Sequence, residues 1–326
     1  MYRTLGLQSM FRKIICGIWQ ARFKPIYTLI LGGTQGGFRA GHGPDMWKAI
    51  AFSVGHAAKA NGHQIWLMYL DLIKAYDTVP RDRVLQILRS IGLPDNMLLP
   101  LEDMFSGVAF VSRTSMGYSE SVECTIGLTQ GCLLSPMLFN VVLEYVRRCW
   151  MRDFPAASRA GGIPMVSALP ALKSEGEVQM VWWSQEETLF ADDIMMEGLS
   201  ATSTSAAAGT FIRCVTAHSG MRASAGRAGK SRGMAYGDVT ADEVVQGDLW
   251  LDHQDGQTLG EAEAIAEAKF IVEKAKGTWM GEPDRTVKRT SKAVYLGTRC
   301  TQDGGFSVEL AHRLNQGNRA WIRHRA

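Results

Sequence analysis

The pattern of apolar and polar positions predicts a protein that mixes helices and strands. Residues 65–71 read IWLMYLD, a continuous apolar run ending in an acid, which is typical of a strand buried on both faces. Residues 187–197 contain LFADDIMM, which predicts a strand, a tight turn and a second strand. Asp192 and Asp193 lie in the middle of this second run, although burying an unpaired carboxylate costs several kcal/mol.

Apolar residues at helical spacing predict several helices around these strands. The first covers residues 10–23, where apolar residues lie at helical spacing: Phe11, Ile14, Ile15, Ile18 and Trp19. A second helix follows Pro80 and stops near Gly92. A third begins at Ser135, which we expect to be its N-cap, with Pro136 in the first turn.

Other segments carry weaker signals. Helices are also expected over residues 45–60, 261–276 and 307–323, and the small polar residues of 199–209 fit either a loop or a helix start. The glycine-dense residues 31–44 predict a loop with special backbone angles. Residues 108–126 predict a hairpin with its turn near Met116, and residues 151–187 are expected to be irregular.

Composition places the chain among globular proteins of two or three subdomains. It has 326 residues, of which 46% are hydrophobic and 21% charged, with a net charge of +3. This net charge gives no bulk electrostatic reason for a nucleic-acid partner, although acids dominate residues 238–273 and bases dominate residues 285–325. Such blocks are usually solvated faces.

The cysteine spacing and the apolar runs indicate the cellular compartment of the protein. The six cysteines form no Cys-x-x-Cys pair, which argues against a zinc site and against a disulfide framework. The sequence shows no signal peptide and no apolar stretch of bilayer length. We therefore expect an intracellular protein of the nucleus or cytoplasm, neither secreted nor bound to a membrane, and the sequence leaves its oligomeric state open.

Two groups of acids, far apart in the sequence, suggest a metal site. Asp71 ends one predicted strand, and Asp192 and Asp193 occupy a predicted hairpin tip. Carboxylates that converge from adjacent strands bind hard divalent cations, whose charge compensates theirs. An Asp-Asp pair by itself is, however, more typical of an ordinary polar turn.

Six segments, in order along the chain, decide between these interpretations. They are YRTLGLQSMFRKIICGIWQARF, TQGGFRAGHGPDM, YLDLIKAYDTVPRDRVLQIL, GLTQGCLLSPMLFNVVLEYV, LFADDIMM and AVYLGTRCTQDGG. Together they resemble the reverse transcriptases of non-LTR (LINE-type) retrotransposons. The resemblance runs along almost the whole chain, and six matches in the right order are far more specific than any one of them.

The resemblance implies a catalytic centre for nucleotidyl transfer. Asp71 and Asp192 would be the principal ligands of two Mg²⁺ ions, with Mn²⁺ as the alternative metal and the backbone carbonyl of Leu72 as a further ligand. Asp193 would be the auxiliary acid. Lys230 would be the lysine that protonates the leaving pyrophosphate, although it lies three residues beyond its usual position, which Arg227 occupies.

The resemblance also implies residues that bind substrate. Tyr76 matches the aromatic sugar gate that disfavours ribonucleotides, although a core-packing role is the alternative. Gln130 and Gly131 match the pair that contacts the nascent base pair. Arg3 matches an arginine that grips the triphosphate, with an exposed surface arginine as the alternative.

A third set of residues would contact template and primer. Arg39 lies in the GFRAG segment, where the resemblance places template backbone and the alternative is again an ordinary surface arginine. Tyr295, Leu296 and Gly297 match the Y-L-G segment of the primer-grip region. The partners implied are an RNA template, a DNA primer and deoxynucleoside triphosphates.

The sequence also departs from the family pattern. His42 replaces an arginine of the GFR segment, and the asparagine expected after Gly220 and Met221 is missing. No endonuclease precedes the polymerase segments and no Cys/His knuckle follows them, so the sequence is expected to be a fragment or a degenerate copy of a longer element.

The resemblance implies an α+β right-hand polymerase fold, with an antiparallel palm sheet backed by helices, partial fingers and the start of a thumb. The expected parts are fingers over 1–62, a palm over 63–237 with a helical fingers insertion at about 80–115, an acidic insertion over 238–285, and a primer-grip region and thumb start over 286–326.

The predicted function is that of an RNA-directed DNA polymerase core. Two alternatives stay open. One is a catalytically inactive, nucleic-acid-binding remnant of such an element, and the other is a reverse transcriptase of the group II intron type.

Overall fold

The structure is a computed structural model of the chain. It describes residues 6–50, 53, 65–155, 163–170, 178–185, 187–225, 230–236, 249–250, 286–289, 292–296 and 298–301. Most of the acidic segment and the helix expected over residues 307–323 therefore lie outside the described residues. Arg3, Arg227 and Gly297 also lie outside them.

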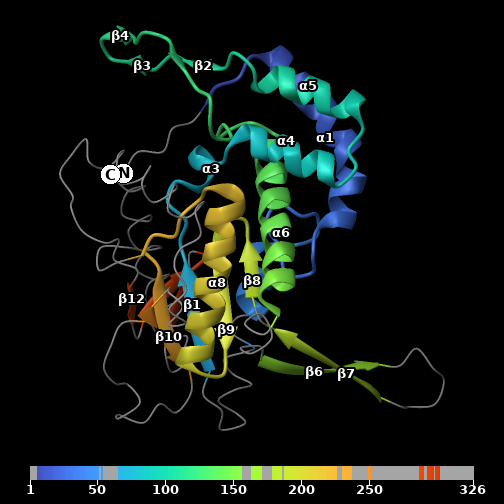
Figure 1. Ribbon diagram of the computed structural model, residues 1–326, viewed down its shortest axis with the longest axis vertical. Helices are drawn as coiled ribbons and strands as arrows, with labels where there is room; N and C mark the ends of the chain where they lie inside the picture. The colour runs from blue at the N-terminus through green and yellow to red at the C-terminus, as the bar shows by residue number, and fades with distance from the viewer. Residues whose placement is uncertain are drawn as a thin grey trace, which may run out of the picture.

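A six-stranded sheet forms the centre of the fold (Figure 1). Its strands, in spatial order, are β11 (Leu249–Trp250), β12 (Thr286–Arg289), β10 (Arg232–Tyr236), β1 (Ile65–Leu70), β9 (Asp193–Gly198) and β8 (Glu187–Phe190). All neighbouring strands pair antiparallel except β10 and β12, which pair parallel. The predicted central strand is confirmed, since every residue of β1 is buried.

Two long helices cover one face of this sheet. They are α6 (Ser135–Asp153) and α8 (Ala201–Ser219), and Figure 1 shows them side by side in front of the strands. The Trp150 indole donates a hydrogen bond of 2.9 Å to the Thr210 hydroxyl and meets Phe211 edge-on at 5.4 Å, which joins the helices across their contact. The small residues of α8 allow this close approach, and residues 201–209, whose sequence fitted either a loop or a helix start, belong to this helix.

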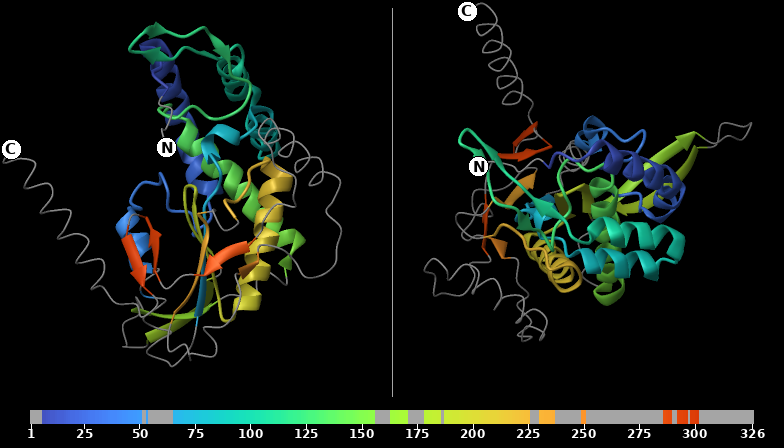
Figure 2. Two further views of the ribbon diagram at one scale, coloured as in Figure 1. Left: turned by 90° about the vertical axis from the view of Figure 1, so that its left-hand side faces the viewer. Right: turned by 90° about the horizontal axis from the view of Figure 1, so that it is seen from above.

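The opposite face of the sheet is partly covered by a short hairpin. It consists of β13 (Lys292–Tyr295) and β14 (Thr298–Thr301), and Figure 2 (left) shows it across the sheet from α8. Tyr295 is buried against Tyr69 of β1, with ring centroids 5.5 Å apart. This contact buries the second face of β1, which explains why its sequence does not alternate between apolar and polar residues.

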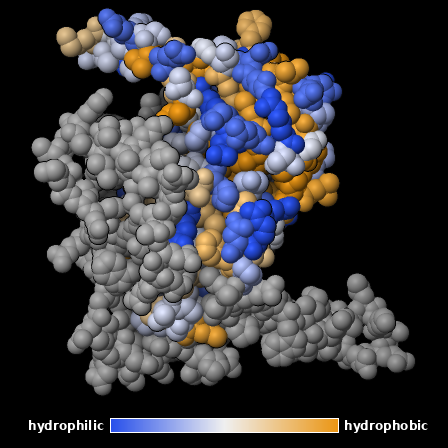
Figure 3. Space-filling model, viewed as in Figure 1, coloured by the Kyte–Doolittle hydropathy of each residue, from blue (hydrophilic) through white to orange (hydrophobic). Residues whose placement is uncertain are grey.

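The first helix forms as predicted, and its buried face differs from the set of apolar residues that indicated it. α1 spans Met10–Ile30 and buries Cys16, Trp19, Phe23 and Tyr27, whose aromatic rings pack in sequence at 4.6 Å and 6.2 Å. Of the apolar residues at helical spacing only Trp19 is buried, while the others are 48–81% exposed: Phe11, Ile14, Ile15 and Ile18. Apolar side chains accordingly gather at the surface over α1 and α5 (Figure 3). The large rings fill the core better than the aliphatic stripe beside them.

Two shorter helices and a hairpin complete the upper part of the molecule in Figure 1. The helices are α4 (Arg81–Ser90) and α5 (Asp95–Phe105). In the hairpin, β2 (Ala109–Phe110) pairs with β5 (Val122–Glu123), and β3 (Arg113–Thr114) pairs with β4 (Gly117–Tyr118). The predicted hairpin is confirmed. Arg81 anchors it, because the buried guanidinium donates hydrogen bonds to the carbonyls of Phe105, Cys124 and Gly127.

Residues 151–187 are more regular than expected. α6 continues to Asp153, and β6 (Ile163–Pro170) pairs antiparallel with β7 (Val178–Gln185) over eight residues each. The aromatic and β-branched residues of VQMVWWSQ favour a strand, and the surrounding glycines and prolines hid that signal. No helix in the described part of the chain is both long and apolar enough to cross a membrane.

A buried carboxyl group on β9 makes the fold sensitive to pH. Glu197 is fully buried and accepts a hydrogen bond of 2.8 Å from the Thr188 hydroxyl. Desolvation raises the pKa of Glu197 to about 7, and the nearby Glu187 adds to the rise. Since the folded state holds this proton more tightly than the unfolded chain, stability falls as pH rises from about 4.3, the ordinary glutamate pKa, through the folded value.

We predict that Glu197→Gln removes part of this pH dependence. The neutral amide keeps an acceptor for Thr188 and avoids ionisation, so the variant should gain up to roughly 3 kcal/mol over the wild type above pH 7 and little at pH 4. Urea unfolding between pH 4 and pH 8 measures the difference, with the exposed Glu120→Gln as the control. The same dependence of the unfolding free energy on pH in the wild type and both variants would contradict the prediction.

Candidate active site

A large cavity lies where β1 and the β8–β9 turn end. Its volume is about 1330 Å³, and its wall combines residues from α1, the loop after α1, the ends of β1 and β8, and the segment before α6. Most residues singled out from the sequence line it: Arg39, Asp71, Leu72, Tyr76, Gln130, Gly131, Asp192, Asp193, Lys230 and Leu296. Residues from six distant segments thus meet at one site.

The strand register brings the carboxylates together. β1 and β9 pair antiparallel with Leu70 opposite Ile194, so the next positions, Asp71 and Asp193, emerge at the same end of the sheet. Phe190 pairs with Asp193, which leaves Ala191 and Asp192 as the two residues of the turn. Ala191 has a φ of 55°, which is uncommon for a residue with a side chain and indicates a constrained turn.

Asp71 is fixed by its backbone and keeps its carboxylate accessible. Its N–H donates to the Ser231 hydroxyl at 3.1 Å, and its carbonyl accepts from the Ser224 N–H at 2.6 Å. The Asp71 side chain is 37% exposed. The strand end therefore presents a rigidly held oxygen ligand to the cavity.

Lys230 reaches this carboxylate despite its displaced position in the sequence. Its Nζ lies 3.6 Å from Asp71 Oδ2, and its N–H donates to the Ser224 hydroxyl at 3.0 Å. The same serine thus holds both the Asp71 carbonyl and the Lys230 backbone. The side chain of Lys230 is 61% exposed, so the ammonium group can move within the cavity.

The glycine-rich loop after α1 supports the Asp192 turn. The side-chain oxygen of Gln35 accepts hydrogen bonds from the N–H groups of Ala191, at 3.0 Å, and Gly37, at 2.8 Å. A Cβ at Gly37 would lie 2.3 Å from the Ala191 nitrogen, so only glycine allows the approach. Two backbone hydrogen bonds extend the contact: the Gly36 N–H donates to the Leu189 carbonyl at 2.9 Å, and the Leu189 N–H donates to the Thr34 carbonyl at 2.9 Å.

Two further polar side chains hold this loop in place. Asn140 of α6 is fully buried and donates to the Gly37 carbonyl at 2.6 Å and to the Tyr27 hydroxyl at 2.7 Å. Arg39 donates to the carbonyls of Gly32, at 2.8 Å, and Gln35, at 3.4 Å, while it lines the cavity. The sequence patterns did not indicate a role for Gln35 or Asn140. A single polar residue inside the apolar run LFNVVL was the available signal for Asn140.

Tyr76 lies on the floor of the cavity with its ring fixed by stacking. It belongs to the short helix α3 (Ala75–Thr78), and its ring packs on Phe139 with centroids 4.7 Å apart and an angle of 20°. Burial raises the pKa of Tyr76, and the negative charge of Asp192 raises it further. The phenol therefore stays neutral beside the carboxylate.

Gln130 and Gly131 form a tight loop on the opposite wall. Gly131 has a φ of 101°, and a Cβ there would lie 2.9 Å from the Gly6 carbonyl oxygen. The Gln130 carbonyl accepts a hydrogen bond of 2.8 Å from the Gly6 N–H. The expectation that Ser135 is the N-cap is wrong, because Leu134 takes that position and the Ser135 hydroxyl donates to the Thr129 carbonyl at 2.8 Å. This bond ties the loop to α6.

The Y-L-G segment divides between core and cavity. Tyr295 packs in the core against Tyr69 and does not line the cavity, whereas Leu296, with a φ of 48°, does. The position of Leu296 places the end of β13 at the cavity edge.

The donor set suits a hard divalent cation. Asp71, Asp192 and Asp193 offer carboxylate oxygens to one cavity, and hard cations such as Mg²⁺ prefer oxygen ligands. Lys230 supplies a positive charge beside one of them, as expected where several carboxylates share a site. The residues present therefore fit a divalent metal ion.

A second group of metal-ligating side chains lies outside this cavity. Asp153, Cys214 and His218 bring one ligand atom each within 4.8 Å of one another, a cluster that was not predicted from the sequence. The i, i+4 spacing of Cys214 and His218 on a helix was its only local signal. Arg152 binds the Asp153 carboxylate at 2.6 Å and 3.0 Å and so competes with a cation for that ligand.

Comparison with solved structures gives distant similarities to telomerases. Apo telomerase from Candida tropicalis, truncated from the C-terminal domain, aligns with 89% of this chain and 43% of its own, at 8% identity and a TM-score of 0.43. Telomerase from Candida albicans, in complex with a fragment of telomeric RNA, aligns with 77% of this chain and 38% of its own, at 10% identity and a TM-score of 0.43.

Sequence comparison gives a family and a relative. The Pol polyprotein from the type-1 retrotransposable element R2 of Popillia japonica is 33% identical over 93 residues, which are 27% of this chain and 15% of that polyprotein. The chain thus matches only a small part of that relative's length. The family model described as reverse transcriptase (RNA-dependent DNA polymerase) matches residues 1–224. The chain belongs to the reverse transcriptase family and, within it, is similar to the enzymes of non-LTR retrotransposable elements.

Proposed function

We propose that this chain is an RNA-directed DNA polymerase core, which extends a primer 3′-hydroxyl with deoxynucleoside triphosphates on an RNA template. The observation that carries the proposal is the convergence of Asp71, Asp192 and Asp193 on one cavity, beside Lys230. The cavity is large enough for a nucleotide together with a primer end, since small-molecule sites typically measure about 300 to 1,000 Å³.

The proposed cofactor is Mg²⁺, with Mn²⁺ as the alternative, and reverse transcriptases generally use divalent metal ions. Asp71 and Asp192 would hold two such ions, with the Leu72 carbonyl as a further ligand and Asp193 as the auxiliary acid. When bound, the ions supply Lewis-acid activation of the attacking hydroxyl and offset the charge of the phosphates.

The chain's own residues position the substrates. Lys230 lies where its ammonium can compensate negative charge near Asp71 and protonate a departing pyrophosphate. The stacked ring of Tyr76 presents a flat surface under the sugar, so a 2′-hydroxyl would clash with it. Gln130 and Gly131 lie opposite, where a backbone without a side chain can approach a base pair.

The remaining proposed contacts serve template and primer. Arg39 lines the cavity while it braces the loop that carries Gln35, so its guanidinium can meet template phosphate at the rim. Leu296 lies at the cavity edge, where the primer end would approach, and Tyr295 supports it from the core. Gly297 and the triphosphate-binding Arg3 complete the proposed set.

The proposed architecture is the right-hand polymerase fold. Residues 63–237 would form the palm, residues 1–62 the partial fingers with a helical insertion at about 80–115, and residues 286–326 the primer-grip region and the start of the thumb. Residues 238–285 would be an acidic insertion. The mainly antiparallel sheet backed by α6 and α8 supports this assignment.

We predict that Asp192→Asn abolishes primer extension. Replacing a metal-binding carboxylate by an amide should lower the extension rate by about a thousandfold, which corresponds to roughly 4 kcal/mol of transition-state stabilisation. The assay uses an RNA template, a DNA primer, the four deoxynucleoside triphosphates and Mg²⁺, and the exposed Asp103→Asn serves as the matched control. If the unaltered chain binds the primer–template without extending it, the inactive remnant replaces the polymerase.

We also predict that Tyr76→Val relaxes the selection of deoxyribonucleotides. Removing the ring opens space under the sugar, so the ratio of kcat/KM for a deoxynucleotide to that for the matching ribonucleotide should fall at least about tenfold. Single-nucleotide incorporation measures this ratio, with Tyr118→Val, at a tyrosine that is 75% exposed, as the control. An active variant with unchanged selectivity would assign Tyr76 to packing against Phe139 alone.

A further inference from the structure

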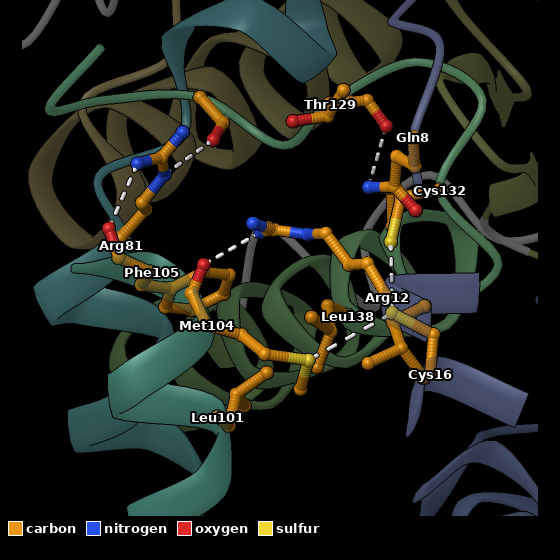
Figure 4. A pocket seen from close by; sticks show the side chains of 13 residues that line it. Gln8, Arg12, Cys16, Arg81, Leu101, Met104, Phe105, Thr129, Cys132 and Leu138 are labelled. Atoms are coloured by element: carbon orange, nitrogen blue, oxygen red, sulfur yellow. Dashed lines mark hydrogen bonds between the residues drawn. The ribbon is translucent and has the colours of Figure 1, made fainter. Parts of the chain in front are cut away.

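Two thiols meet beside the catalytic cavity. The Sγ atoms of Cys16, on α1, and Cys132, directly after Gly131, are 3.7 Å apart, and Figure 4 shows them facing each other in a small pocket. Cys16 Sγ also lies 3.8 Å from the sulfur of Met104 on α5. The pair therefore bridges the first helix and the loop proposed to contact the nascent base pair.

The two thiols differ in access. Cys16 is 1% exposed, whereas Cys132 is partly buried and lines both the small pocket and the large cavity. A small reagent that enters the catalytic cavity can therefore reach Cys132, while Cys16 is shielded behind it. This arrangement pairs one reactive cysteine with one that can resolve its oxidised form.

The surroundings of Cys132 favour its thiolate. The hydrogen bond with Cys16 lowers the pKa of Cys132, and the backbone N–H groups of Leu134 and Ser135 at the start of α6 lower it further. The same bond raises the pKa of Cys16, and so does the burial of this thiol. The thiolate is the nucleophile in thiol oxidation, so Cys132 is the one that attacks.

We propose that Cys132 is an oxidative modification site, where a peroxide generates a sulfenic acid that Cys16 converts into a reversible Cys16–Cys132 disulfide. In the first step the Cys132 thiolate sulfur bonds to one peroxide oxygen, the O–O bond breaks, and the other oxygen leaves as hydroxide or alkoxide, which takes a proton from solvent to become water or an alcohol. In the second step Cys16 sulfur attacks Cys132 sulfur and the hydroxyl leaves as water. With hydrogen peroxide, two thiols and one H₂O₂ give one disulfide and two waters.

The disulfide would displace the loop that carries Gln130 and Gly131. A disulfide bond is about 2.05 Å long, so the sulfurs must approach by about 1.7 Å from their separation of 3.7 Å. Cys16 lies on the buried face of α1 and cannot easily move. The Cys132 N–H donates to the Thr129 carbonyl at 3.1 Å and closes a turn around Gln130 and Gly131, so this turn takes up the movement.

The functional consequence rests on the proposed polymerase activity, whereas the disulfide does not. Moving a loop that positions the nascent base pair by 1 Å or more should slow extension by roughly ten- to a hundredfold. In a reducing compartment the disulfide forms only transiently, and reduction restores the loop.

Peptide mapping of the unaltered chain tests the modification. The purified protein is treated with equimolar hydrogen peroxide, free thiols are alkylated, and peptides are identified by mass spectrometry. We expect a Cys16–Cys132 linked peptide as the main product, absent after reduction with dithiothreitol. In Cys16→Ala the sulfenic acid should persist on Cys132 and react with dimedone. Linkage to Cys124 or Cys300 instead, or unoxidised Cys132, would overturn the proposal.

Primer extension tests the consequence. The rate should fall in proportion to the linked peptide and recover with dithiothreitol, both in the unaltered chain and in the control Cys124→Ala. Full extension by a protein that is completely linked would overturn the effect on the loop. A reduced protein that never extends primers would instead count against the proposed function, while the linked peptide still reports on the modification site.

Discussion

The register between β1 and β9 is the constraint on which the candidate active site depends. With Leu70 opposite Ile194, the two strands deliver Asp71 and Asp193 to the same end of the sheet, and the turn beside them carries Asp192. A shift of one residue would exchange side chains between the two buried faces of the sheet and disrupt their packing. The buried residues of β1 and β9 therefore fix the positions of the carboxylates, and packing energy holds the like charges together.

The strand register alone does not determine the turn, and a second layer of contacts completes it. Gln35 satisfies the Ala191 N–H, Asn140 satisfies the Gly37 carbonyl, and the two residues link the turn to α6 and α1. Each is buried, so losing either would leave a polar group unpaired at a cost of about 1 to 3 kcal/mol. The rigid turn is thus stabilised by residues that do not themselves reach the carboxylates.

The opposite wall of the cavity is built differently. Gln130 and Gly131 lie in a turn held by backbone hydrogen bonds, by the Ser135 hydroxyl and by contact with residue 6, not by strand pairing. Such a turn moves more easily than a sheet, since fewer buried contacts oppose its movement. The thiol pair Cys16 and Cys132 lies at this wall. Oxidation of the pair to the proposed disulfide would therefore displace the turn that carries Gln130 and Gly131.

The sequence by itself predicted the central strand and the Asp192 hairpin from local patterns, such as the apolar run before Asp71. The candidate catalytic residues followed instead from the resemblance of six ordered segments to a known family. Local patterns did not determine which face of α1 is buried, because aliphatic and aromatic stripes both have helical spacing and only packing against the core chooses Trp19, Phe23 and Tyr27. Nor could they show that Lys230 reaches Asp71, that Gln35 supports Ala191 or that Cys16 meets Cys132. These pairs are far apart in the sequence, and only the tertiary structure brings their atoms into contact.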